Sequence, residues 1–132
     1  MVWQKSKRTS ADVFHAHVYC DIKNKKSAFR FRSQVKKAFN ITDRSRNFKL
    51  GRWHDEPVGP HPRPMFLIWF KAKEFGAVVP WLSINHKDLS ILVHPQFDDP
   101  VTDHTDHAMW IGKPIKLRLS GFSGKPLEKR GM

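Results

Sequence analysis

The first residues able to do chemistry are two histidines, His15 and His17, in a stretch that alternates apolar and polar side chains. Read with the period of two of a β-strand, the apolar even-numbered residues fall on one face, and both histidines fall with Tyr19 on the other. Two imidazoles on one strand face lie about 7 Å apart and can reach the same metal ion. The simpler alternative is that one histidine is a surface residue and the other packs against Tyr19.

Further along the chain, four histidines lie in stretches that can join this pair. They are His54, His61, His94 and His104. The first two belong to residues 54–64, where four prolines exclude helix and strand pairing but stiffen the backbone, as suits a segment that holds side chains in place. The third ends a predicted strand on its non-core face, and the fourth lies in the acidic stretch 98–107.

The elements that must position these histidines follow from the apolar pattern. We expect four strands, at residues 12–20, 48–53, 65–70 and 89–94, and two helices, at residues 25–39 and 75–82. Pro80 is expected to kink or divide the second helix, because proline cannot donate the backbone hydrogen bond of a helix interior. Ile115, Leu117 and Leu119 alternate with charged residues and predict an additional edge strand.

This β-α-β-β-α-β order predicts an α+β, ferredoxin-like fold, with both helices on one face of a four-stranded antiparallel sheet. With the strand order 4-1-3-2 of that fold, His94 comes close to His15 and His17 on the open face. The loop with His54 and His61 starts at the opposite end of the sheet. It joins them only by folding over the open face or from a second subunit. Because the open apolar face needs a cover, we predict a homodimer.

The length and composition indicate a single globular domain. The chain has 132 residues, of which 39% are hydrophobic and 12% aromatic. We expect the folded domain at residues 12–119, between flexible segments at 1–11 and 120–132. A lone cysteine, Cys20, excludes an intrachain disulfide, and there is no apolar leader or membrane-length run, which predicts a cytoplasmic protein without a membrane partner.

The net charge of +12 raises the alternative of a nucleic-acid partner. The basic residues, however, are spread over both termini, residues 23–37 and residues 44–52 rather than gathered in one stripe. The first strand also places histidines on its open face, where an RNA-binding sheet of this kind carries aromatic residues. We therefore expect solvated helix faces and tails, and no nucleic acid.

Six motifs occur in order along residues 13–117. They are Phe-His-Ala-His-Val-Tyr at 14–19, Gly-Arg-Trp-His-Asp-Glu-Pro-Val-Gly-Pro-His-Pro at 51–62, Pro-Met-Phe at 64–66, Val-Val-Pro-Trp-Leu at 78–82, Leu-Val-His-Pro at 92–95 and Asp-His-Thr-Asp-His-Ala-Met-Trp-Ile-Gly at 103–112. In composition and spacing these motifs resemble the DOPA 4,5-dioxygenase family of small extradiol enzymes. The resemblance implies a ferredoxin-like fold, a non-haem metal and cleavage of a catechol ring, such as that of dihydroxyphenylalanine (DOPA), with O2.

The resemblance also implies a ligand set for the metal. We expect Fe(II), with zinc as a substitute, because an all-imidazole site accepts both ions. The expected ligands are all histidines: His15, His17, His61 and His94. Of these, His15 lies either in contact with the metal or behind another ligand. If a carboxylate takes part, as in the more usual site of two histidines and one carboxylate, the candidates are Asp99 and Asp103.

Ring cleavage also needs proton transfer and a partner for the substrate. His54 and His104 are the candidates for the general acid and base, since an imidazole titrates near neutral pH; a supporting structural role is the alternative. Arg52 is the candidate partner for a substrate carboxylate. Three tryptophans can either wall an aromatic pocket or pack in the core. They are Trp53, Trp81 and Trp110.

A second function is compatible with the same histidines, namely a metal-binding or sensor domain of the same fold that does not turn over a substrate. Both functions need the same ligands, so the sequence does not separate them. Oxygen consumption by the Fe(II)-loaded protein in the presence of a catechol distinguishes the enzyme from the sensor.

Overall fold

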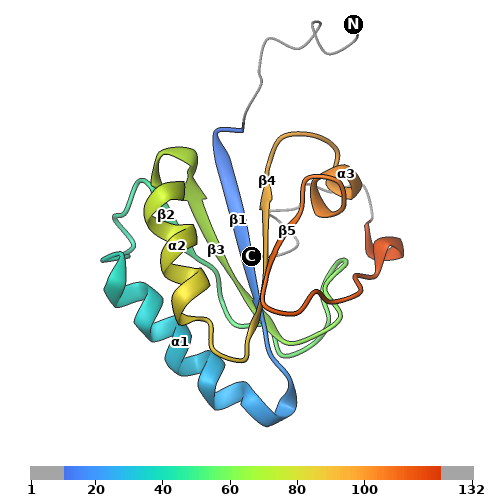
Figure 1. Cartoon of the computed structure of the whole chain (residues 1–132), viewed down its shortest axis with the longest axis horizontal. Helices are drawn as coiled ribbons and strands as arrows, with labels where there is room; N and C mark the ends of the chain where they lie inside the picture. The colour runs from blue at the N-terminus through green and yellow to red at the C-terminus, as the bar shows by residue number, and fades with distance from the viewer. Residues whose placement is uncertain (1–10, 123–132) are drawn as a thin grey trace, which may run out of the picture.

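A five-stranded antiparallel sheet organises residues 11–122, the part of the chain that this computed structural model describes (Figure 1). The strands are β1 (Val13–Tyr19), β2 (Phe48–Leu50), β3 (Met65–Lys71), β4 (Ser90–Pro95) and β5 (Met109–Ile111), in the order β2-β3-β1-β4-β5. The helices α1 (Lys25–Ala38) and α2 (Phe75–Asn85) lie on one side of the sheet, and the short helix α3 (Pro100–His104) lies on the other, near β4 (Figure 1). Three turns of 3-10 helix are Ile22–Asn24, Ala72–Glu74 and Leu119–Gly121.

The predicted α+β, ferredoxin-like arrangement is confirmed. β1 pairs antiparallel with both β3 and β4, β2 pairs with β3, and the two long helices share one face. β5 adds a fifth strand beside β4. The predicted flexible segments fall mainly on residues 1–10 and 123–132, which lie outside the described residues. Within the described part, no helix combines the length and apolarity needed to cross a bilayer.

The core between the sheet and the long helices fixes the orientation of β1. The period of two in this strand places Ala16 and Val18 in that core, where both are fully buried. α1 contributes Phe31 and Val35, which lie four residues apart and therefore on the same helix face. Burial of each such large side chain stabilises the fold by about 1.5–3 kcal/mol. The odd-numbered residues of β1 must then point to the open face.

Two strands differ from the predictions. β2 ends at Leu50, earlier than expected, and the chain rejoins β3 only at an isolated bridge between His54 and Met65. The predicted edge strand at residues 115–119 is wrong, because the edge is taken by β5. Ile115 and Leu117 pack instead against side chains of the open face. Their alternation therefore reflects a contact with the face of the sheet and not a place in the ladder.

α2 runs through Pro80 without a break, so of the two predicted effects of this proline, a kink or a division, the division is wrong. The missing proline N–H leaves the carbonyl of Gly76 without its helical partner. Both residues are exposed, so water can hydrate that carbonyl. A proline on the solvent side of the helix is tolerated for this reason.

The open face of the sheet is covered by the chain itself. Tyr19, Met65 and Leu92 form a buried cluster there, which we call the open-face cluster; each is at most 1% exposed. Side chains from the loop before β3 and from the segment after α3 cover it: Val58, Ala108, Trp110, Ile115 and Leu117. The need for a cover no longer argues for a second subunit, and the homodimer stays a prediction that a single chain does not test.

Replacing Leu92 by alanine tests this cover. Because Leu92 is fully buried within one chain, we expect the free energy of unfolding to fall by about 2–5 kcal/mol, and by the same amount at any protein concentration. The control is Ile84→Ala, at a residue that is 80% exposed, which should change stability by less than about 0.5 kcal/mol. Urea unfolding at two protein concentrations measures both. A loss that varies with concentration would mean that a partner covers this face.

Candidate metal centre

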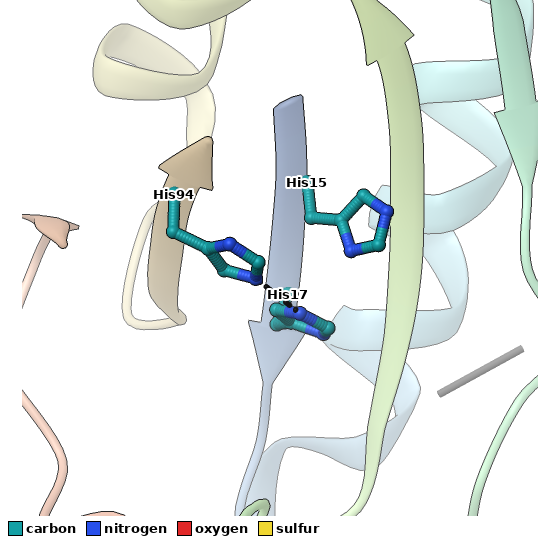
Figure 2. Close-up of side chains that lie close together, drawn as sticks. All are labelled: His15, His17 and His94. Atoms are coloured by element: carbon teal, nitrogen blue, oxygen red, sulfur yellow. Dashed lines mark hydrogen bonds between the residues drawn. The ribbon is translucent and has the colours of Figure 1, made fainter. Parts of the chain in front are cut away.

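Three histidines come together on the open face because of how β1 and β4 pair. His15 and His94 are direct partners across the two strands, and His17 lies two residues further along β1 on the same face. Figure 2 shows the three imidazoles, with a hydrogen bond between His17 and His94. The Nε2 atoms of that pair are 3.0 Å apart, and the rings of His15 and His94 lie 5.2 Å apart, centroid to centroid. The pairing of two strands thus fixes three imidazoles side by side.

The proline-rich loop folds over the open face of its own chain and adds His61. Two backbone hydrogen bonds between His54 and Met65, at 2.9 and 3.0 Å, hold the loop to β3. A tight turn from Val58 to His61 then reverses the chain. The His61 ring lies 4.0 Å from the ring of His17, centroid to centroid. Of the two routes that the sequence leaves open, the structure takes the one within a single subunit.

α3 adds a fifth histidine, His104, through a short capped helix. Asp99 starts the helix by accepting the N–H of Thr102 at 3.0 Å, and Pro100 follows in the first turn. At the other end, the His104 ring lies 4.0 Å from the ring of His94. Its Nδ1–H donates to the Pro100 carbonyl at 2.8 Å, which fixes the direction of the ring.

The carboxylate of Asp103 ties α3 to the end of β4 instead of facing the histidines. It is buried and accepts hydrogen bonds at 3.0 Å from the backbone N–H groups of Phe97 and Asp98 and from Nδ1–H of His107. Asp99 is used as the cap of α3. Among the described residues, neither carboxylate belongs to a group that could hold a metal, so the arrangement gives no support to a carboxylate ligand.

Burial keeps the central imidazoles neutral. His15, His17 and His94 have no exposed surface. Burial, together with the nearby His104, lowers the pKa of His15 to about 3. Burial and the neighbouring imidazoles lower the pKa values of His17 and His94 well below their usual 6.5. A neutral imidazole offers a nitrogen lone pair, which is the form that binds metals.

Hydrogen bonds at Nδ1 decide which nitrogen of each ring faces its neighbours. Nδ1 of His94 lies 2.9 Å from the carbonyl of Pro95, as that of His104 does from its own proline carbonyl at 2.8 Å. Because a carbonyl oxygen only accepts, both rings carry hydrogen on Nδ1 and a lone pair on Nε2. His17 then donates its Nε2–H to Nε2 of His94. Its own Nδ1 is buried and has no hydrogen-bond partner in the described part of the chain.

Two groups of three histidines place one ligand atom per residue within 4.8 Å of the others. They are His15, His17 and His94, and His17, His61 and His104. The Nε2 atoms of His17 and His94, 3.0 Å apart, are close enough to bind one ion at about 2.1 Å each, provided that the hydrogen of His17 moves from Nε2 to Nδ1. Nε2 of His15, like Nδ1 of His17, is buried without a hydrogen-bond partner among residues 11–122. These observations fit a metal ion held by imidazoles.

Two predicted site residues lie outside both groups. His54 is 5% exposed and is held to β3 through its backbone. Arg52 is exposed and lines a surface groove formed by residues 52–58. The groove belongs to the same loop that delivers His61, but neither residue is part of a group of potential ligands.

Only one of the three candidate tryptophans packs on the open face. Trp53 and Trp81 pack against the core on the helix side. The ring of Trp110 lies 6.0 Å from that of Tyr19, centroid to centroid, within the open-face cluster. Core packing therefore accounts for the first two, and Trp110 remains the candidate for a wall near the histidines.

Two contacts have no counterpart in the sequence-based predictions. The Tyr19 hydroxyl lies 2.6 Å from Nδ1 of His61, and the side-chain amide of Gln96 donates to Nδ1 of His15 at 3.4 Å. The place of His104 in a ligand group is also new. The first contact has a signal in the sequence, since Tyr19 shares the strand face of the two histidines before it. The contact of Gln96 with His15 and the place of His104 have no such signal, because Gln96 and His104 lie in segments without a regular apolar pattern.

Known proteins are similar in sequence to this chain over most of the residues that form the fold and the cluster of histidines. A family model described as the Dopa 4,5-dioxygenase family matches residues 14–121. An uncharacterized 21.2 kDa protein of Botryotinia fuckeliana is 38% identical over 119 residues, which cover 81% of this chain and 61% of that protein. The DOPA 4,5-dioxygenase of Amanita muscaria is 38% identical over 73 residues, covering 55% of this chain and 32% of that enzyme. The chain thus spans less than two thirds of the length of either relative.

A solved structure shares the fold. The crystal structure of a candidate dioxygenase from Nostoc punctiforme matches with a TM-score of 0.76 and 39% sequence identity. The match covers 84% of this chain and 90% of that one. Because the likeness extends over most of both chains, it applies to the domain as a whole.

The buried histidines predict how the stability of the metal-free protein depends on pH. The pKa values of His15, His17 and His94 in the fold lie below the value of about 6.5 in an unfolded chain, so the unfolded state binds more protons at acid pH. Stability is therefore full above about pH 6.5. It is lost as the pH falls below that value, by about 1.4 kcal/mol per pH unit for each histidine.

Urea unfolding of the metal-free protein at a series of pH values between neutrality and about pH 5 measures this slope. His15→Gln should reduce the slope of the free energy of unfolding against pH by about 1.4 kcal/mol per pH unit, the contribution of one histidine. Ile84→Gln, at an exposed residue that does not titrate, is the control and should leave the slope unchanged. A free energy of unfolding that stays constant over this range would contradict the burial of neutral imidazoles.

Proposed function

The chain belongs to the Dopa 4,5-dioxygenase family, and from that membership we propose that it is a non-haem, metal-dependent extradiol dioxygenase. Its substrate is a catechol such as DOPA, whose ring is opened with O2. The observation that carries this proposal is the set of five buried histidines in mutual contact on the open face. Without a ligand such a set is costly, because each unsatisfied buried polar group costs about 1–3 kcal/mol.

The metal ligands in this proposal are His17, His61 and His94, with His15 and His104 as further candidates. His17 is central, because it belongs to both groups of potential ligands. The resident ion is Fe(II), and zinc is a substitute that imidazoles accept equally well. When bound, Fe(II) supplies the electron transfer between a catechol and O2 that protein side chains do not provide.

The surroundings of the histidines suit ring cleavage. Neutral imidazoles add no negative charge to the centre, so a catechol bound there loses its protons more readily than in water. The open-face cluster of Tyr19, Met65 and Leu92 is buried on the same side of the sheet as the histidines. These side chains keep water away and so strengthen the electrostatic interactions of the centre.

We assign proton transfer to His54 and His104. His104 has its hydrogen on Nδ1, held by the Pro100 carbonyl, so its Nε2 carries a lone pair, which can accept a proton or bind a metal. His54 stands on the loop that forms the groove of residues 52–58. In that groove Arg52 is the partner for the carboxylate of an amino-acid substrate.

Oxygen consumption by the Fe(II)-loaded protein with DOPA is the direct test. We expect O2 uptake together with a yellow, ring-opened semialdehyde. His17→Ala should abolish both metal retention and O2 uptake, because both groups of potential ligands include His17. The matched control is His86→Ala, outside the cluster, which should preserve both.

Two results would contradict the proposal in different ways. Full metal content in His17→Ala would reject the site. Metal retention without O2 uptake, with any catechol, would reject the enzyme and favour a metal-binding or sensor domain of the same fold.

Substitution of the two proton-transfer candidates separates their roles. His54→Ala should lower turnover by about 10²–10⁴-fold and leave the metal content unchanged, the effect expected for loss of a general acid or base. His104→Ala should lower turnover in the same range. Metal analysis of that variant then shows whether His104 moves protons, if metal stays bound, or is a ligand, if metal is lost. Unchanged turnover in His54→Ala would leave that residue a structural role only.

A further inference from the structure

The hydrogen bond between the Tyr19 hydroxyl and Nδ1 of His61, 2.6 Å long, has no place in the proposed chemistry. We propose that Tyr19 is a positioning residue, whose hydroxyl holds Nδ1 of His61 and so directs Nε2 of that ring toward the other histidines. This inference deepens the proposed function by assigning a tyrosine to the metal centre. The one part of the proposed function on which it rests is the binding of a metal by His61.

Tyr19 is a fixed point for the loop that carries His61. Its backbone pairs with Met65 of β3 on one side and with Ser90 of β4 on the other, at the end of the central strand. Its side chain is fully enclosed within the open-face cluster. His61, by contrast, comes from residues 54–64, a loop whose backbone meets the sheet at its two ends, through the bridge of His54 with Met65 and through a hydrogen bond from the N–H of Cys20 to the carbonyl of Pro64. The strand therefore holds the hydroxyl in place, and the hydroxyl holds the loop histidine.

This hydrogen bond is buried, since Tyr19 is 1% exposed and His61 is fully enclosed. Apolar side chains pack against the open-face cluster to which Tyr19 belongs, and the rings of His17 and His61 lie 6.4 and 5.6 Å from the Tyr19 ring, centroid to centroid. In such a low-dielectric environment a hydrogen bond is stronger than in water, and neither atom can turn to solvent if the bond is lost. Removal of the hydroxyl should therefore change how His61 is held.

The same arrangement recurs at two other histidines of the cluster. Nδ1 of His94 and Nδ1 of His104 each donate to a proline carbonyl, which leaves Nε2 available to the neighbouring rings. Histidines that bind metals usually have their second nitrogen held in this way, because the acceptor fixes the tautomer and the orientation of the ring. Tyr19 gives His61 the equivalent support. Of these three supports, it is the one that a side-chain substitution can remove.

The hydrogen bond also couples Tyr19 to the tautomer of His61. When His61 binds a metal through Nε2, its hydrogen is on Nδ1 and is donated to the tyrosine oxygen. When Tyr19 donates instead, the hydrogen of His61 is on Nε2 and blocks that nitrogen. A change from the second state to the first moves one hydrogen from Nε2 to Nδ1 of His61, with no net gain or release of protons, and turns the hydroxyl from donor to acceptor.

Tyr19→Phe removes the hydroxyl and keeps the ring. With Zn²⁺ as the probe and a chromophoric chelator as competitor, we expect the affinity to fall by about 10–100-fold, the range for loss of a support behind a metal-binding histidine. The matched control is Leu117→Val, which alters packing against the open-face cluster without removing the hydrogen bond, and should keep the affinity of the unchanged protein.

A double-mutant cycle distinguishes positioning from general loosening of the fold. In a His61→Ala background, Tyr19→Phe should have no further effect on Zn²⁺ affinity, because the hydroxyl has already lost its partner. An equal loss in both backgrounds would mean that Tyr19 acts through packing, and no loss in either would mean that it has no part in the centre. Either result overturns the proposal.

A second measurement leaves Tyr19 unchanged. The sequence contains one tyrosine, so tyrosine labelled with ¹³C at Cζ gives a single resonance, from the carbon that bears this hydroxyl. We expect the resonance to shift when Zn²⁺ binds, and to stay in place in His61→Ala. A resonance that does not respond to saturating Zn²⁺ in the unchanged protein would overturn the proposal.

Failure of this inference and failure of the proposed function give different results, because the Zn²⁺ experiments involve no substrate and no turnover. Coupling between Tyr19 and bound Zn²⁺, without O2 uptake by the Fe(II) form, would uphold the positioning role and reject the dioxygenase. O2 uptake combined with a metal affinity that does not depend on Tyr19 would do the reverse. A protein that binds no Zn²⁺ at all would overturn the role of Tyr19 and the metal centre together.

Discussion

The candidate metal centre depends on one constraint, the burial of β1 on both of its faces. Ala16 and Val18 anchor one face in the core under the helices. Because strand side chains alternate, His15 and His17 have to point to the opposite face. A slip of one residue in the pairing would exchange the two sets and place the imidazoles among apolar side chains. His94 pairs with His15 across β1 and β4, so the register of these strands also fixes the position of a third imidazole.

Burial of so many polar rings is compensated in two ways. Their neutrality avoids placing charge in a low-dielectric interior, and hydrogen bonds hold Nδ1 of three rings, through the carbonyls of Pro95 and Pro100 and the hydroxyl of Tyr19. Within residues 11–122, one nitrogen each of His15 and His17 is left without a hydrogen bond. Buried polar atoms are rarely left so in a folded protein. Their concentration at one point distinguishes a ligand site from an ordinary polar core.

The part of the centre that lies on the sheet, which we call the sheet half, consists of His15, His17 and His94. Its arrangement could be predicted from the sequence, because strand alternation and strand order allow few positions for these side chains. That reasoning alone brings His15 and His17 together with His94. The position of the proline-rich loop does not follow from the residue pattern, since such a segment has no period that gives its direction, and the expectation that His61 is a ligand rests on the family resemblance. His54 and His61 lie on the same loop, yet only His61 reaches a ligand group. Which of the two does so is decided by where the backbone is held to β3, and nothing in the residue pattern reports that.

The two halves also differ in how firmly they are held. The ladder fixes His15, His17 and His94 in register. The rings of His61 and His104 come from a loop and a five-residue helix, and a hydrogen bond at Nδ1 orients each of them. An ion bound at His17 joins the two halves, because His17 belongs to both groups, and its binding free energy then adds to the stability of the whole domain. The sheet half sets where an ion sits. The loop and α3 contribute His61 and His104 from outside the ladder, so a change in their position leaves the pairing of the strands unchanged.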